Sequence, residues 1–188
     1  MRERLLSGRM SPKEMAGTFL GTLSFGMGRT GFSALMSGMT ASYRGLAEST
    51  LEEVGEEVFA KHLIRQIYPE SRALVEAHQR AGHTVAIISS ATRYQVAPFA
   101  RELGIDLVMN TELEVKDGVF TGEVIHPTCY GEGKAIAARQ VAEQEGVDLD
   151  ESYFYSDSHE DIQLLEAVGR PRPLNPNRQL AQIAKERN

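Results

Sequence analysis

The stretch from Glu151 to Glu166 changes abruptly from apolar to acidic residues and then to a helical pattern. It opens with the aromatic run 153–155, whose residue types favour a buried strand. Polar and acidic residues follow, and apolar residues then return at helical spacing. This order predicts a strand, a turn and a helix, with Asp157 at the carboxyl end of the strand and Asp161 on the first helical turn. Gly169 is expected to end that helix at its C′ position.

Two acids at the end of a strand have two interpretations. In open α/β sheets ligands bind beyond the carboxyl ends of the strands, and Mg²⁺ is held by one or two carboxylates together with water and phosphate oxygens. Asp157 and Asp161 are therefore candidate magnesium ligands. The alternative is that the pair caps the helix, because acids near a helix N-terminus interact favourably with its dipole. Taken alone, the pair favours capping.

Size and charge limit the classes of protein to which this chain can belong. Its 188 residues suit one domain with an insertion or two small domains. A net charge of −6 argues against nucleic acid as the main partner. No stretch approaches the roughly 20 apolar residues that a membrane span requires. The single cysteine, Cys129, excludes an internal disulfide and fits a reducing cytoplasm.

Residues 1–81 are expected to form a helical domain. Ser11 and the three residues after it give a helix start signal, with a proline at the first helical position and a glutamate three residues after the cap. Apolar residues recur over 32–39 and 48–67. A further helix is expected over 70–81.

Residues 26–31 read GMGRTG and match the G-x-G-x-x-G dinucleotide fingerprint. That fingerprint needs a strand before it, a helix after it and a second strand within about 30 residues. The next credible strand begins only at Thr84. A flexible connection between helices is favoured, and dinucleotide binding is the weaker alternative.

From residue 82 onward, strands and helices alternate. Compact apolar runs predict strands, and the Lys-Asp-Gly sequence at 116–118 predicts a hairpin turn. Alternation of this kind implies a parallel sheet covered on both faces, the Rossmann-like α/β class. The expected strands are 83–88, 104–109, 112–115, 119–124 and a strand beginning at 153, and the expected helices are 93–103, 135–145 and 177–187.

Three features would meet at one edge of this sheet. Ser89 and Ser90 lie between a strand and a helix, where hydroxyls and backbone N–H groups suit an anion, although a helix cap is an equally good interpretation. Lys134 begins a helix, where its charge opposes the helix dipole, so a bound phosphate would explain it. With the acids at 157 and 161, these residues predict a site for Mg²⁺ and a phosphate.

The segments VAIISSAT, GEGKAIAA and YFYSDSHEDIQLLEAVG resemble the second, third and fourth motifs of the haloacid dehalogenase superfamily, in its phosphoserine-phosphatase-like branch. The resemblance covers residues 82–176. It implies a Rossmann-like core over 82–188 and a helical cap over 1–81. It also implies Mg²⁺-dependent hydrolysis of a small phosphate monoester through an aspartyl-phosphate.

The resemblance assigns a role to each site residue. Ser89 matches the residue that hydrogen-bonds the transferring phosphoryl group, with Ser90 beside it in the substrate site. Lys134 matches the lysine that offsets negative charge on the nucleophile and the phosphate. Asp157 matches the metal-ligating acid, and Asp161 matches the acid that supports or shares the metal site.

The chain departs from the family pattern in two places. Glu160 stands where an asparagine is usual, and this raises a question about the substrate. The family's nucleophile lies in a D-x-D-x-[TV] motif after the first strand, but no aspartate precedes Asp106. We therefore expect that the nucleophile and its strand lie outside this chain through truncation. Fusion to or association with another domain is left open. The alternative is a phosphate-binding pseudo-phosphatase.

Overall fold

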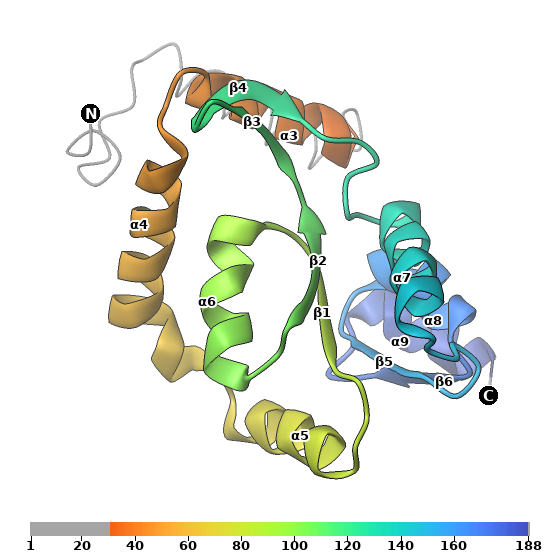
Figure 1. Ribbon diagram of the computed structural model, residues 1–188. Coiled ribbons are helices and arrows are strands. Elements are labelled where there is room, and N and C mark those ends of the chain that lie inside the picture. Colours follow the sequence, from red (N-terminus) through yellow and green to blue (C-terminus); the bar gives the residue numbers. More distant parts are fainter. Residues whose placement is uncertain (1–30, 188) are drawn as a thin grey trace. The chain divides into compact units, whose positions relative to one another are not determined.

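The computed structural model describes residues 31–187, and contacts divide the chain into two compact units. The first, here called the helix–hairpin unit, comprises residues 1–64 and 112–126, of which the structure describes the part from residue 31. The second, the α/β unit, comprises residues 65–111 and 127–188. The α-helices and strands of both units are labelled in Figure 1.

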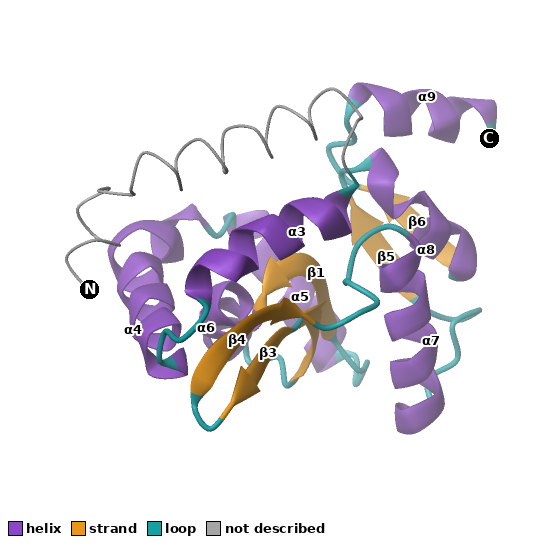
Figure 2. Ribbon diagram, turned by 90° about the horizontal axis from the view of Figure 1, so that it is seen from above, coloured by secondary structure: helices purple, strands orange, loops and turns teal. Residues whose placement is uncertain are grey.

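In the helix–hairpin unit, α3 lies along a two-stranded antiparallel hairpin (Figure 2). The turn of this hairpin contains Asp117 and Gly118, whose φ angles of 52° and 74° are those of a type I′ turn, so the predicted hairpin is confirmed. The elements of the unit are α3 (Phe32–Thr40), η1 (Ala41–Tyr43), α4 (Glu48–Val58), a π-helical turn η2 (Phe59–Leu63), β3 (Leu113–Lys116) and β4 (Val119–Val124).

Phe120 forms the centre of this unit, with a side chain that is only 2% exposed. Its backbone N–H donates to Leu46 O and its carbonyl accepts from Gly45 N–H, so the connection before α4 pairs with β4. The hydroxyl of Thr40 donates to Gly122 O across 3.2 Å. These bonds attach the hairpin to the helices that precede it by about 80 residues in the chain.

The α/β unit contains two pairs of parallel strands, β1 with β2 and β5 with β6. The predicted α/β class with parallel strands is confirmed, but the described strands of this unit form two small sheets instead of one. The elements are α5 (Pro69–Arg80), β1 (Ala86–Thr92), α6 (Arg93–Leu103), β2 (Leu107–Thr111), α7 (Glu132–Glu145), β5 (Tyr153–Ser156), η4 (His159–Asp161), α8 (Ile162–Ala167), β6 (Arg170–Pro173) and α9 (Arg178–Glu186), with a short turn η3 (Ile64–Gln66) at the boundary of the two units.

The contacts divide the chain differently from the predicted domains 1–81 and 82–188. Helix α5 groups with the α/β unit because it is bonded to α6 and its C-terminal end. Arg72 forms an ion pair with Glu102 at 2.7 Å, and Gln79 Nε2 donates to the carbonyl oxygens of Leu103 and Gly104. Such contacts depend on tertiary packing and leave no periodic signal in the sequence.

Two element ends differ from the expectation for physical reasons. The strand expected over 104–109 begins three residues later, because Gly104 adopts a left-handed φ of 63° and ends α6. Gly169 does not serve as a left-handed C′ residue, since Val168 is already extended where α8 ends. A Cβ atom added at Gly169 would lie 1.7 Å from the carbonyl oxygen of Asp150, so glycine permits a close backbone approach.

Two predictions fall on residues 1–30, outside the described part. They are the helix start at Ser11 and the glycine motif at 26–31, of which only Gly31 is described. Within the described residues, every helix is too short or too polar to cross a lipid bilayer.

Candidate active site

Three of the predicted site residues come from separate elements of the α/β unit and share one neighbour. Ser89 lies in β1, Lys134 in α7, and Asp161 in the turn η4 that follows β5. Cys129, only 3% exposed, receives a hydrogen bond from the Ser89 backbone and interacts electrostatically with Lys134 and Asp161. The fold therefore brings the middle of β1 and the turn after β5 to the first turn of α7.

Lys134 and Asp161 form a buried ion pair. The Lys134 Nζ atom lies 2.6 Å from Asp161 Oδ1, and the two side chains are 11% and 9% exposed. The hydroxyl of Ser156 donates to Asp161 Oδ2 across 2.7 Å. Both carboxylate oxygens of Asp161 therefore accept a hydrogen bond. Asp161 also supplies the counter-charge for the buried Lys134, so this lysine does not need a bound phosphate to be stable at a helix start.

The glycines before Lys134 have a backbone role. Gly131 has a positive φ of 51°, which favours glycine. A Cβ atom added at Gly133 would lie 1.9 Å from the carbonyl oxygen of Thr128. The Gly-x-Gly-Lys sequence therefore allows the first turn of α7 to lie directly against the preceding loop, which places Lys134 in the interior.

The serines lie within strand β1, which extends to Thr92, and not between a strand and a helix as predicted. Helix α6 begins only at Arg93, and Thr92 caps it through hydrogen bonds with Gln95 Oε1. The interpretation of the serines as helix caps is wrong, because another residue occupies that position. The Ser89 hydroxyl accepts from the N–H of Ala91 at 3.2 Å, whereas Ser90 forms no side-chain hydrogen bond within the described chain.

Asp157 directly follows β5 and is exposed. Among residues 31–187, its carboxylate has no hydrogen bond or ion pair, and only its backbone carbonyl is bonded, by Asn177 N–H at 2.7 Å. Asp161 is instead the last residue of η4 and the residue before α8. The two predicted metal ligands therefore differ: one carboxylate is free and the other is neutralised by Lys134.

The described residues contain no cluster of three or more acidic, histidine or cysteine side chains that could hold a metal ion. Mg²⁺ does not require such a cluster, since it commonly binds one or two carboxylates and completes its shell with water and substrate phosphate oxygens. Asp157 has the free hard oxygens that this mode needs. Asp161 could be a second metal ligand only if its carboxylate bound the metal and Lys134 at the same time.

The carboxylate of Glu160 is hydrogen-bonded within the protein. Its Oε1 atom accepts from the hydroxyl of Tyr130 across 2.5 Å, and its backbone N–H donates to the hydroxyl of Ser158. Burial, followed by the hydrogen bond to Glu160 and its charge, raises the pKa of Tyr130 and keeps the phenol protonated. This pairing offsets part of the repulsion that a carboxylate would exert on a phosphate.

Sequence reasoning missed Cys129 and Ser156 as parts of this site. Cys129 lies in a loop, but it is buried and interacts with Ser89, Lys134 and Asp161. Burial raises the pKa of its thiol, although the charge of Lys134 opposes the shift. Ser156 ends the apolar strand just before Asp157. This position was the only feature of the sequence that could have indicated a role for Ser156 in the site.

A family model for haloacid dehalogenase-like hydrolases matches residues 3–166 of the chain. The chain belongs to the haloacid dehalogenase-like hydrolase family. This result confirms the resemblance carried by the three motifs.

Two curated relatives of this haloacid dehalogenase-like chain illustrate its similarity. An inhibition of morphological differentiation protein of Streptomyces azureus is 40% identical over 150 residues, which cover 79% of this chain and 54% of the relative. A phosphoserine phosphatase of Mycobacterium tuberculosis is 34% identical over 147 residues, which cover 78% of this chain and 48% of the relative. The chain spans about half the length of the curated relatives it matches.

A solved structure supports the fold of this haloacid dehalogenase-like chain. It is a crystal structure of a protein of unknown function from Bordetella pertussis Tohama I, with a TM-score of 0.87 and 27% sequence identity. The alignment covers 99% of this chain and 86% of that protein. The fold therefore has a counterpart in an experimental structure.

Proposed function

We propose that the protein is a Mg²⁺-dependent phosphatase of a small phosphate monoester. The observation that carries this proposal is the buried Lys134–Asp161 pair beside Ser89, with the free carboxylate of Asp157 at the end of β5. The family assignment and the phosphoserine phosphatase among the relatives support a phosphoryl-transfer site.

Each residue has a physical role in this proposal. The ammonium group of Lys134, fixed by Asp161, supplies a positive charge for a phosphate. The hydroxyl of Ser89 donates a hydrogen bond to a phosphoryl oxygen. Asp157 holds Mg²⁺, which, when bound, neutralises phosphate charge and polarises the phosphoryl group.

The proposal places the nucleophilic aspartate outside these 188 residues, because no aspartate precedes Asp106. The second candidate function, binding of phosphate without hydrolysis, is favoured by the same observation. In that case the buried ion pair and Ser89 would form an anion site without a nucleophile.

We infer that the ligand is a small phosphorylated metabolite and not a nucleic acid, since the net charge of −6 opposes a polyanion. A cytoplasmic location and an association with a further domain stay predictions. The free, buried thiol of Cys129 is consistent with a reducing compartment.

The test is calorimetric titration of the 188-residue chain with inorganic phosphate, with and without MgCl₂, together with assays of phosphoserine hydrolysis. The expected result is Mg²⁺-dependent phosphate binding that Asp157→Asn weakens by about tenfold or more, since one lost charged ligand costs at least about 1.4 kcal/mol. Asp150→Asn, at another exposed aspartate of the same unit, is the control.

Three outcomes separate the possibilities. Absence of phosphate binding with Mg²⁺ would contradict both functions. Phosphate binding by the natural full-length protein without any hydrolysis would favour the pseudo-phosphatase. Turnover by the 188-residue chain that disappears in Asp157→Asn would contradict the placement of the nucleophile outside it.

A further inference from the structure

A cluster of basic and aromatic side chains lies in the α/β unit, outside the candidate active site. The two tyrosines of the cluster come from β5, the two arginines from β6, and the two histidines from α5 and the loop after it. The members of this tyrosine–arginine cluster are His78, His83, Tyr153, Tyr155, Arg170 and Arg172. The proposed phosphatase chemistry uses none of them.

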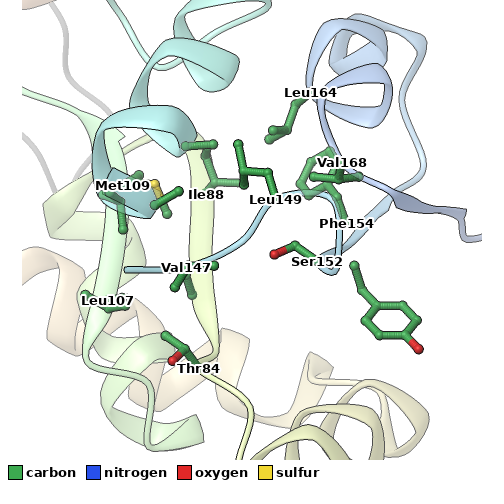
Figure 3. A pocket seen from close by; sticks show the side chains of 15 residues that line it. Thr84, Ile88, Leu107, Met109, Val147, Leu149, Ser152, Phe154, Leu164 and Val168 are labelled. Atoms are coloured by element: carbon green, nitrogen blue, oxygen red, sulfur yellow. The ribbon is translucent and has the colours of Figure 1, made fainter. Parts of the chain in front are cut away.

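The cluster occupies the face of β5 that is opposite to the apolar interior. Phe154 lines an apolar cavity of the unit (Figure 3). Because side chains alternate along a strand, Ser156 shares the face of Phe154, whereas Tyr153 and Tyr155 share the other face. Tyr153 also borders the cavity, but its ring contacts the histidines and arginines of the cluster. Ser156 is the strand residue that is bonded to Asp161, so the cluster and the candidate active site lie on different faces of β5.

Both arginines lie over the ring of Tyr153. The Cζ atoms of Arg170 and Arg172 are 5.1 Å and 5.2 Å from the centroid of this ring. A cation–π contact holds the guanidinium group in place but does not use its N–H groups. These N–H groups form a planar fork that matches two oxygens of a phosphate or carboxylate.

The two arginines differ in their counter-charges. Arg170 forms an ion pair with Glu151, and its Nη1 atom donates to the Tyr153 hydroxyl across 3.1 Å. Arg172 is exposed and donates to the carbonyl oxygen of Pro171 across 2.9 Å. In the described part of the chain, no carboxylate pairs with Arg172. Its guanidinium group therefore has both the charge and the donors to bind an anion.

The histidine pair adjoins the same tyrosines. Nδ1 of His78 lies 2.8 Å from Nδ1 of His83, and Nε2 of His78 lies 2.9 Å from the Tyr155 hydroxyl. The exposed ring of His83 lies nearly parallel to that of Tyr153, at 6.4 Å and 20°. Burial, and then the charge of His83, lower the pKa of His78. An anion beside this pair would supply the missing counter-charge.

We propose that the tyrosine–arginine cluster binds a phosphate group, at a second site that is separate from the candidate active site. Arg172 supplies a bidentate contact, and the imidazole of His83 supplies a further donor. The chain carries a net charge of −6, yet the cluster combines two guanidinium groups with one carboxylate. A tetrahedral dianion is favoured over a carboxylate because its oxygens accept from arginine and imidazole donors in different directions. The proposal does not rest on the proposed phosphatase function.

The test is an NMR titration of the 188-residue chain with inorganic phosphate, at neutral pH and constant ionic strength, without Mg²⁺. The imidazole signals of His78 and His83 should shift, whereas those of His126, exposed in the other unit, should not. Arg172→Gln is expected to weaken binding by about tenfold or more, because a bidentate charged contact is lost. Arg139→Gln, at an exposed arginine of α7, is the matched control and should leave binding unchanged.

Further arms identify the ligand and the site. Methyl phosphate distinguishes an ester, which would bind at least as tightly as inorganic phosphate, from the free ion, and either result supports the proposal. Equal effects of acetate and phosphate would overturn it, as would unchanged phosphate binding in Arg172→Gln. A requirement for Mg²⁺ together with loss of binding in Asp157→Asn would assign the phosphate to the candidate active site and also overturn it. Phosphate binding without Mg²⁺ that persists in Asp157→Asn would support the second site even if the proposed function is wrong.

Discussion

The Nζ atom of Lys134 lies 2.6 Å from Oδ1 of Asp161, and the two side chains are about nine-tenths buried. This pair connects the first turn of α7 to the turn after β5. It explains how a lysine is stable at a helix start, where the helix dipole is unfavourable to a positive charge. It also fixes the ammonium group at the edge where the strands end.

Breaking this ion pair should strongly destabilise the α/β unit. Asp161→Asn and Lys134→Met are each expected to lower the free energy of unfolding by about 3–5 kcal/mol. The reason is that each substitution removes one charge of the pair and leaves the other charge buried without its partner. Urea unfolding followed by circular dichroism measures this change. Glu76→Gln, in an exposed pair with Arg80, should change it by less than about 1 kcal/mol.

The double variant of the same pair gives a second test. If the two charges interact, the combined loss should be smaller than the two single losses together by at least about 1 kcal/mol. Additive losses would show that the pair does not couple the two elements.

Gly133→Ala should be destabilising, because the new Cβ atom would meet the carbonyl oxygen of Thr128 at 1.9 Å. The expected loss is about 1–3 kcal/mol, as for other overpacked interior sites. Gly38→Ala in α3 is the matched control, since a Cβ atom there meets nothing within 4 Å. That control should stabilise its helix by about 0.5–1 kcal/mol, and equal effects of the two substitutions on unfolding would contradict the close approach.

Stability should fall as the pH falls through the range of His78. Burial, and then the charge of His83, lower the pKa of His78 below its ordinary value of 6.5. Its Nδ1 atom lies 2.8 Å from His83 Nδ1, and its Nε2 atom lies 2.9 Å from the Tyr155 hydroxyl. Below pH 6.5, His78 is protonated in the unfolded chain but stays neutral in the folded chain. The free energy of unfolding therefore falls as the pH falls, until the pH is below the pKa of His78 in the folded chain.

Thermal unfolding at pH values from 7.5 to 5 measures this loss. We expect a shallower pH dependence in His83→Gln, since the repulsion between two charged imidazoles is absent. His126→Gln, at an exposed position of the helix–hairpin unit, should leave the slope unchanged. A slope identical in all three proteins would show that the histidine pair does not contribute.

Glu160→Gln should strengthen Mg²⁺-dependent phosphate binding by up to about tenfold, or about 1.4 kcal/mol. The substitution removes a negative charge near the proposed site but keeps an acceptor for the Tyr130 hydroxyl. Calorimetric titration with inorganic phosphate measures the change, with Glu166→Gln on α8 as the control. Weaker binding in Glu160→Gln would show that the carboxylate has a positive role.

Local sequence signals predicted a large part of the fold. The Asp-Gly pair specified the hairpin turn, since few residues tolerate its positive φ angles. The aromatic run before Asp157 specified strand β5 and the exposed acid after it. These features depend on residues that are neighbours in the chain, so composition and spacing are sufficient to find them.

Other features came only from the tertiary structure. No local pattern indicates that Asp161 is the partner of Lys134, 27 residues before it, or that Cys129 lies between them and Ser89. The division into units also depended on long-range contacts, such as the hydrogen bond from Thr40 to Gly122. The sequence determined which residue types follow each strand, and hence the family and the candidate residues. Only packing decided which carboxylate is neutralised and which is free, because ion pairing depends on distances between segments that are far apart in the chain.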